Sequence, residues 1–202
     1  MRVLMAPDAI AGLAAVEVAD ALRAGWLAGA AHDEVTTAPL GDGGPGLLRA
    51  VQAARGGLLE VVTVPDPVGR PTPATVLVLD GPDGRTVVVE AAQALGTALL
   101  DGPGHPGRAS SRGLGLLLAA ALDLAPRRVV VGLGGCATHD AGTGMLAGLG
   151  LTAPVLGRGG AALGDVTPAD VAGVTGLRDE WARVDLVVAA DVDLAALGLH
   201  GA

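Results

Sequence analysis

Four aspartates follow short apolar runs that are typical of buried strands: Asp8, Asp42, Asp140 and Asp191. In parallel α/β sheets, ligands bind beyond the carboxyl ends of the strands. A carboxylate at that edge can hold a metal ion or orient a substrate hydroxyl. We therefore predict that the four aspartates lie at a ligand-binding edge, lined by glycine loops that accept a phosphorylated small molecule. The alternative for each one alone is a helix cap or a turn former.

Two glycine-rich loops accompany these carboxylates. Gly43 and Gly44 precede Pro45, which suits the first turn of a helix. Glycine lets backbone N–H groups approach a phosphate, and a helix start carries partial positive charge. This loop has neither the lysine nor the spacing of a P-loop.

The second loop lies within residues 129–146, where a buried strand is followed by dense glycine. Its candidate ligand-binding residues are Gly134, Gly135, Thr138 and Asp140. Cys136 and His139 suggest cysteine–histidine catalysis as an alternative, but no third orienting partner can be assigned. We predict a phosphate- or substrate-binding loop.

The elements that position these loops predict an α/β protein. Strands are expected at residues 3–6, 34–40, 58–64, 74–79, 86–90, 128–131 and 185–190, and helices at residues 14–27, 45–55, 110–124 and 144–149. The opening β-α-β-α order favours a parallel sheet with helices on its faces. A hairpin-rich section then favours a second, mixed subdomain.

Composition excludes several functional classes. The net charge is −8, lysine is absent and the 13 cationic residues are scattered arginines, which argues against nucleic-acid binding. Cys136 is the single cysteine, so no internal disulfide is expected. No signal peptide or membrane-spanning run is visible, and a cytoplasmic location is the default expectation.

The sequence resembles the glycerate kinase family, the bacterial glycerate 2-kinase type, in several motifs that occur in the family's order. These are Ala6-Pro7-Asp8, Gly41-Asp42-Gly43-Gly44-Pro45-Gly46, Gly69-Arg70-Pro71, Val89-Glu90-Ala91-Ala92, Gly132–Asp140 and Ala190-Asp191-Val192. The resemblance implies ATP-dependent phosphorylation of D-glycerate with Mg²⁺. It also implies an incomplete flavodoxin-like domain at residues 1–70 and a second α/β domain with the glycine-rich loop at residues 71–202.

Residue by residue, the resemblance implies catalytic roles for the four aspartates and metal binding by Asp8, Asp42 and Asp191. It implies substrate or phosphate binding by Gly43, Gly44, Gly134, Gly135 and Thr138.

The sequence also departs from the family pattern. Ala9 and Ala11 stand where the family has serine and lysine, and the chain is about half as long as family members. A catalytically inactive member that binds a small acid or nucleotide, or that serves as an interaction protein, is therefore the alternative. A homo-oligomer or a second polypeptide that supplies the missing half is a further expectation.

Overall fold

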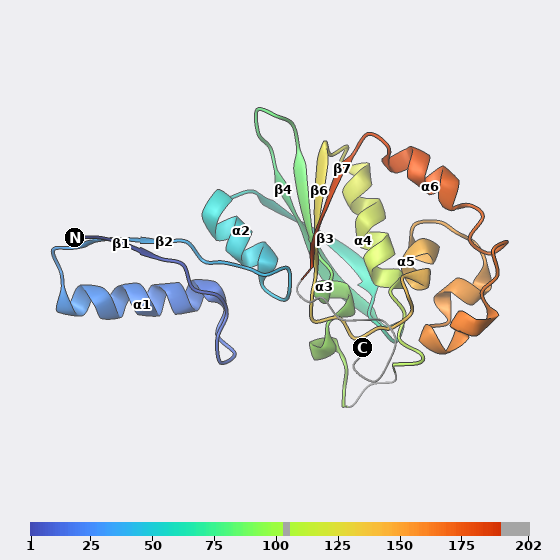
Figure 1. Ribbon diagram of the computed structural model, residues 1–202, viewed down its shortest axis with the longest axis horizontal. Coiled ribbons are helices and arrows are strands. Elements are labelled where there is room, and N and C mark those ends of the chain that lie inside the picture. The colour runs from blue at the N-terminus through green and yellow to red at the C-terminus, as the bar shows by residue number, and fades with distance from the viewer. Residues whose placement is uncertain (103–105, 191–202) are drawn as a thin grey trace.

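The computed structural model describes residues 1–102 and 106–190, which form two sheets and their covering helices (Figure 1). The strands are β1 (Arg2–Met5), β2 (Glu34–Thr37), β3 (Leu58–Pro65), β4 (Pro71–Leu79), β5 (Thr86–Glu90), β6 (Arg128–Leu133) and β7 (Asp185–Ala190). The α-helices are α1 (Ala15–Gly29), α2 (Leu47–Arg55), α3 (Ala92–Leu95), α4 (Arg112–Asp123), α5 (Thr143–Gly148) and α6 (Val174–Trp181). Three short 3₁₀ helices are η1 (Thr97–Leu99), η2 (Pro154–Gly157) and η3 (Gly160–Asp165).

The larger sheet has the strand order β3-β4-β5-β6-β7. The β3, β4 and β5 strands are antiparallel neighbours, whereas β5, β6 and β7 run parallel. The carboxyl ends of β5, β6 and β7 therefore meet at one edge of the sheet, with Glu90 opposite Gly132 and Leu133 opposite Ala190. The loop that leaves β6 at this edge is the predicted glycine-rich segment.

Alternating side chains of the larger sheet pack on helices at its two faces. Val87, Val89 and Val129 belong to a buried cluster with Leu117 of α4. On the other face, Leu77 and Val88 pack with Leu47 and Leu48 of α2. Because successive strand residues point to opposite faces, the apolar runs of β4 and β5 predict this two-sided burial.

The smaller sheet consists of β1 and β2, which pair in parallel with α1 packed against them. In Figure 1 this unit extends from the side of the molecule that carries α2. Its apolar surface is thinly covered, because Leu4 is 66% exposed and Leu22 is 48% exposed.

Most predicted elements are confirmed. The prediction for β7 matches residue for residue, and β4 begins earlier than expected, at Pro71. The structure adds α3 and α6, which the sequence pattern does not predict. Two 3₁₀ helices, η2 and η3, follow α5, where no strand or helix was predicted.

The predicted boundary between residues 70 and 71 falls at the turn between β3 and β4, which are paired strands of one sheet. The division into two domains stays a prediction. In the part of the chain that the structure describes, no helix is both long and apolar enough to cross a membrane.

Candidate active site

The loops that carry Asp8 and Asp42 leave the smaller sheet side by side. The amide of Leu40 donates to the carbonyl of Pro7 at 2.9 Å, which extends the pairing of β1 and β2 beyond their ends. Asp8 is exposed, and one carboxylate oxygen accepts the Ala9 amide at 2.7 Å. Its second oxygen has no partner among the described residues, so it can accept a proton donor or bind a cation.

The Asp42 loop lies on the carboxyl ends of β6 and β7. Gly43 has φ +101°, and a Cβ there would overlap the carbonyl oxygen of Ala189. A Cβ on Gly132 would lie 2.5 Å from the carbonyl oxygen of Gly43. The two positions must therefore be glycine, because backbone touches backbone at this junction. Asp42 itself is exposed, and its Oδ1 accepts the Gly44 amide at 2.8 Å.

A buried carboxylate occupies the start of α2. The side chain of Glu90, at the carboxyl end of β5, accepts the Leu48 amide at 3.0 Å and is only 6% exposed as a residue. A negative charge at a helix N-terminus is favourable. The predicted phosphate cradle therefore already has two of its amides, those of Gly44 and Leu48, bonded to carboxylates of the chain itself.

Asp140 is buried and joins the glycine-rich loop to α4. Its Oδ2 accepts the Ser111 amide at 2.7 Å, the Ser111 hydroxyl at 2.9 Å and the Gly144 amide at 3.1 Å. Its Oδ1 accepts the Gly142 amide at 3.1 Å. This carboxylate is 2% exposed and has four donors, so it fixes the loop relative to the helix.

Ser111 holds the N-cap position of α4, where either Ser110 or Ser111 suits a helix cap by residue type. Its side chain does not cap the helix, however. The hydroxyl donates to Asp140 and accepts the Met145 amide at 2.8 Å. The Ser111 hydroxyl thus forms hydrogen bonds with Asp140 and Met145 instead of capping its own helix.

The remaining predicted residues of the glycine-rich loop lie in different environments. Gly134 is buried, whereas Gly135 is exposed with φ +63° and its Cβ position is 2.9 Å from the ring of Pro45. Thr138 donates its hydroxyl to the carbonyl of Ala109 at 3.2 Å. These contacts bring the glycine-rich loop against the Asp42 loop and the segment before α4.

The cysteine in this loop is poorly suited to nucleophilic catalysis. Burial raises the pKa of the Cys136 thiol, and a backbone interaction with Gly134 offsets this only in part. The reactive form of a cysteine is the thiolate, so a raised pKa reduces its share at neutral pH. No hydrogen bond joins Cys136 to His139 in the described part of the chain.

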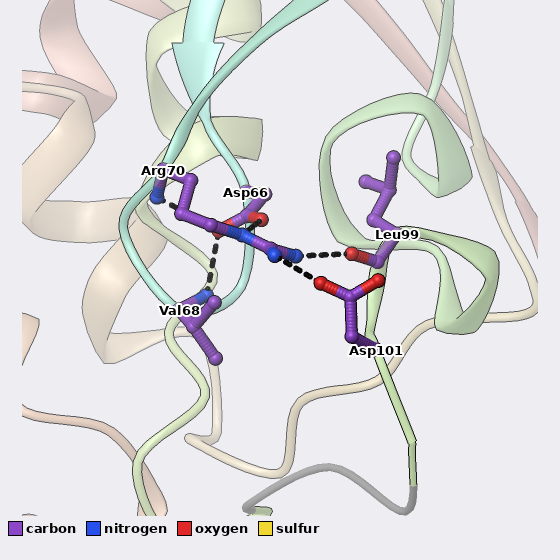
Figure 2. Close-up of polar contacts among 5 residues, drawn as sticks. All are labelled: Asp66, Val68, Arg70, Leu99 and Asp101. Atoms are coloured by element: carbon purple, nitrogen blue, oxygen red, sulfur yellow. Dashed lines mark hydrogen bonds and ion pairs between the residues drawn. The ribbon is translucent and has the colours of Figure 1, made fainter.

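Arg70, in one of the family-like segments, ties the turn between β3 and β4 to the end of η1 (Figure 2). Its guanidinium donates to Asp66 at 2.7 Å, to Asp101 at 2.6 Å and to the Leu99 carbonyl. Burial tends to raise the pKa of the Asp66 carboxyl, but the hydrogen bonds from Arg70 and the Val68 amide outweigh it and hold that pKa below its ordinary value. The network therefore stabilises the turn rather than presenting a free charge to a ligand.

The loops of Asp8 and Asp42 and the 132–140 segment thus form one connected set of contacts, which reaches β7 at Ala189. Asp191 lies outside the described residues. Among the cavities lined by described residues alone, those at α5–α6, at the β6–β7 side of α6, between α1 and α2, and at the start of α4 are not lined by Asp8, Asp42 or Asp140. Within residues 1–102 and 106–190, no group of three or more histidine, cysteine or acidic side chains could hold a metal ion.

Sequence reasoning assigned no site role to Glu90, and to Ser111 it gave only that of a possible helix cap, shared with Ser110. For Glu90, the available signal was its place at the end of a valine-rich strand. A charge in such a buried strand needs a hydrogen-bond partner, which marks the residue as one with a structural or functional role. No sequence signal distinguishes a capping serine from one that bonds a distant aspartate.

Comparison with known proteins places these features in a family. The sequence model of the Glycerate kinase family matches residues 3–202. The chain is 36% identical over 210 residues to "Glycerate kinase" of Bacillus subtilis (strain 168), covering 100% of this chain and 53% of that protein. It is 32% identical over 210 residues to "Glycerate 2-kinase" of Escherichia coli (strain K12), covering 100% of this chain and 54% of that protein.

Among solved structures, the crystal structure of a glycerate kinase 2 from Salmonella typhimurium LT2 superimposes with a TM-score of 0.79 at 30% identity. The match covers 100% of this chain and 55% of that one. The chain therefore spans about half the length of the relatives it matches. The matches extend from the first strand to the glycine-rich loop and beyond, and the chain belongs to the glycerate kinase family.

Proposed function

We propose that this chain takes part in the ATP-dependent phosphorylation of D-glycerate. The observation that carries the proposal is the backbone junction of Gly43, Gly132 and Ala189. It gathers two predicted ligand loops at the carboxyl ends of parallel strands, where α/β proteins bind their ligands. The names of the Bacillus subtilis and Escherichia coli relatives supply the substrate.

Asp8 and Asp42 are proposed to face the metal and the phosphates. Both carboxylates are exposed, and each uses one oxygen for a backbone amide. Mg²⁺ usually takes one or two protein carboxylates together with substrate phosphates, so a small donor set fits it better than a closed cage. When bound, Mg²⁺ neutralises charge that develops on the transferred phosphoryl group.

Asp140 is proposed to act by positioning. Its four hydrogen bonds hold the glycine-rich loop at the start of α4, which supports accurate placement of Gly134, Gly135 and Thr138 for the substrate. Orientation of reacting groups contributes strongly to phosphoryl transfer, because the protein does little covalent chemistry itself. The catalytic assignments of Asp140 and Asp191 stay predictions, as does the cytoplasmic location.

An inactive, ligand-binding family member is the second candidate, and the absence of lysine from the whole chain favours it. A lysine near the phosphates supplies a point charge that stabilises the transition state. Removing such a charge typically slows catalysis by about 10²–10³-fold.

A second polypeptide chain is proposed to complete the site region. Among the described residues β7 is an edge strand of the larger sheet, and Leu186 and Val188 are 51% and 53% exposed. Unpaired edges with apolar side chains favour pairing with another chain. Light scattering of the purified chain tests this: a monomer at all concentrations would rule it out.

Turnover is tested by coupled ADP release with D-glycerate, ATP and Mg²⁺. The variants Asp8→Asn and Asp42→Asn suit this assay because both side chains are exposed, so the fold should be retained. We expect each to lower the rate at least about tenfold, while Asp20→Asn on α1 leaves it unchanged.

Calorimetry with ATP·Mg²⁺ separates the two candidates. Binding without turnover supports the inactive member. If neither ATP nor D-glycerate binds, both candidates fail.

A further inference from the structure

A cavity of about 370 Å³ lies at the start of α4, and none of Asp8, Asp42 and Asp140 lines it. Its walls come from the β3–β4 turn, the segment before α4 and η2. The polar and charged residues that line it are Asp66, Arg108, Ser110 and Arg112. A volume of this size lies in the range of small-ligand pockets, roughly 300–1,000 Å³.

The walls of this cavity are anchored by hydrogen bonds. The Ser110 amide donates to the Pro67 carbonyl at 2.9 Å, which joins the segment before α4 to the β3–β4 turn. Thr138 bonds the Ala109 carbonyl, and Asp140 bonds Ser111. The cavity is therefore formed without any ligand, and binding needs little free energy to order its walls.

The charges around the cavity leave it positive. Asp66 is the one acidic side chain in the described lining, and its carboxylate is already bonded to Arg70 and to the amides of Val68 and Arg70. Arg108 and Arg112 form no ion pair with any described residue. Two arginines without an ion-pair partner among the described residues therefore line a cavity whose single carboxylate is neutralised.

We propose that this cavity binds the anionic group of a small molecule, a carboxylate or a phosphate, through Arg108 and Arg112. Guanidinium groups bind both oxyanions with paired, charge-assisted hydrogen bonds. The Ser110 hydroxyl, which accepts the Arg112 amide at 3.3 Å, adds a donor at the same wall. The proposal goes beyond glycerate phosphorylation and holds whether or not the chain turns over substrate.

The cavity also adjoins the proposed active site. Ser110 and Arg112 flank Ser111, whose amide and hydroxyl are bonded to Asp140. An anion held by the two arginines would therefore lie beside the segment that fixes the glycine-rich loop, so binding there stabilises the loop's arrangement.

Calorimetric titration of the full chain at constant ionic strength tests the proposal, with inorganic phosphate and D-glycerate titrated separately. We expect at least one of them to bind, and the double variant Arg108→Gln/Arg112→Gln to weaken that binding about tenfold or more. Binding of phosphate alone, of glycerate alone or of both identifies the anionic group that the cavity prefers.

The matched control is Arg23→Gln, which removes an exposed arginine from α1 and should leave both titrations unchanged. Failure of both probes to bind the unaltered chain overturns the proposal. So does equal affinity in the double variant, or an equal loss in the Arg23 control. If ADP release is absent but arginine-dependent binding persists, the kinase proposal fails and this one stands.

Discussion

Replacing Asp140 with alanine should destabilise the protein more than the same change at the exposed Asp8 or Asp42. The change removes the acceptor of four hydrogen bonds, from the Ser111 amide and hydroxyl and from the amides of Gly142 and Gly144. Each buried donor left without a partner costs about 1–3 kcal/mol. Because the loop relaxes and water enters, the costs do not add fully, and we expect a loss of about 3–5 kcal/mol.

Asparagine separates the hydrogen bonds from the volume of the side chain. Oδ2 of Asp140 accepts three of the four donors, so an asparagine oxygen at that position keeps three bonds. Its NH₂ group then faces the Gly142 amide, which is also a donor. The variant loses one bond and the charge assistance of the others, so we expect Asp140→Asn to cost about 1–3 kcal/mol.

Urea unfolding followed by far-ultraviolet circular dichroism measures these losses, provided that the slope with denaturant stays constant. The control is Asp20→Ala, on the exposed side of α1, for which we expect a change within about 0.5 kcal/mol. If Asp140→Ala costs no more than this control, the carboxylate does not organise the loop. A larger loss for asparagine than for alanine would also refute the hydrogen-bond argument.

Three further predictions concern the same framework. Gly43→Ala should lower the unfolding free energy more than Gly46→Ala. The two glycines share φ near +100°, but only a Cβ at Gly43 would overlap Ala189. Equal losses of the two variants in urea unfolding would contradict the backbone junction. Glu90→Gln should lower the unfolding free energy by about 1 kcal/mol in the same assay, because it removes the negative charge at the start of α2. An unchanged unfolding free energy would show that this charge does not stabilise the helix. Asp66→Asn should flatten the acid dependence of stability: the depressed pKa of Asp66 stabilises the fold above about pH 4, and that contribution disappears as the pH falls through the folded-state pKa. Parallel stability curves for the variant and the unaltered chain between about pH 5 and pH 2 would contradict it.

Periodicity predicted most of the fold because burial follows simple spacing in these elements. The valine-rich strand β5 is buried on both faces, and β7 shows the same apolar run although it lies at an edge. α6 was missed because it has no buried residues and therefore no apolar stripe at helical spacing. Its last residue, Trp181, packs partly buried against the main core cluster, a contact that a sequence pattern does not record.

The candidate site was predicted only in outline. The sequence placed Asp42 and the glycine-rich loop after strands, and the structure brings their loops together through Gly43 and Gly132. The sequence could not show that the buried Asp140 bonds Ser111, which is 29 residues away in the chain. Nor could it show that Glu90 occupies the start of α2, because both contacts join residues that are distant in sequence.

The backbone junction at Gly43, Gly132 and Ala189 has a consequence for how this family diversifies. The position of the Asp42 loop is set by main-chain atoms, provided that positions 43 and 132 stay glycine. An exposed side chain such as Asp42 can then change at the cost of one local hydrogen bond, with the Gly44 amide, while this main-chain contact stays. Selection can therefore exchange chemical groups along a rigid rim, and enzymes and non-catalytic descendants can share one scaffold.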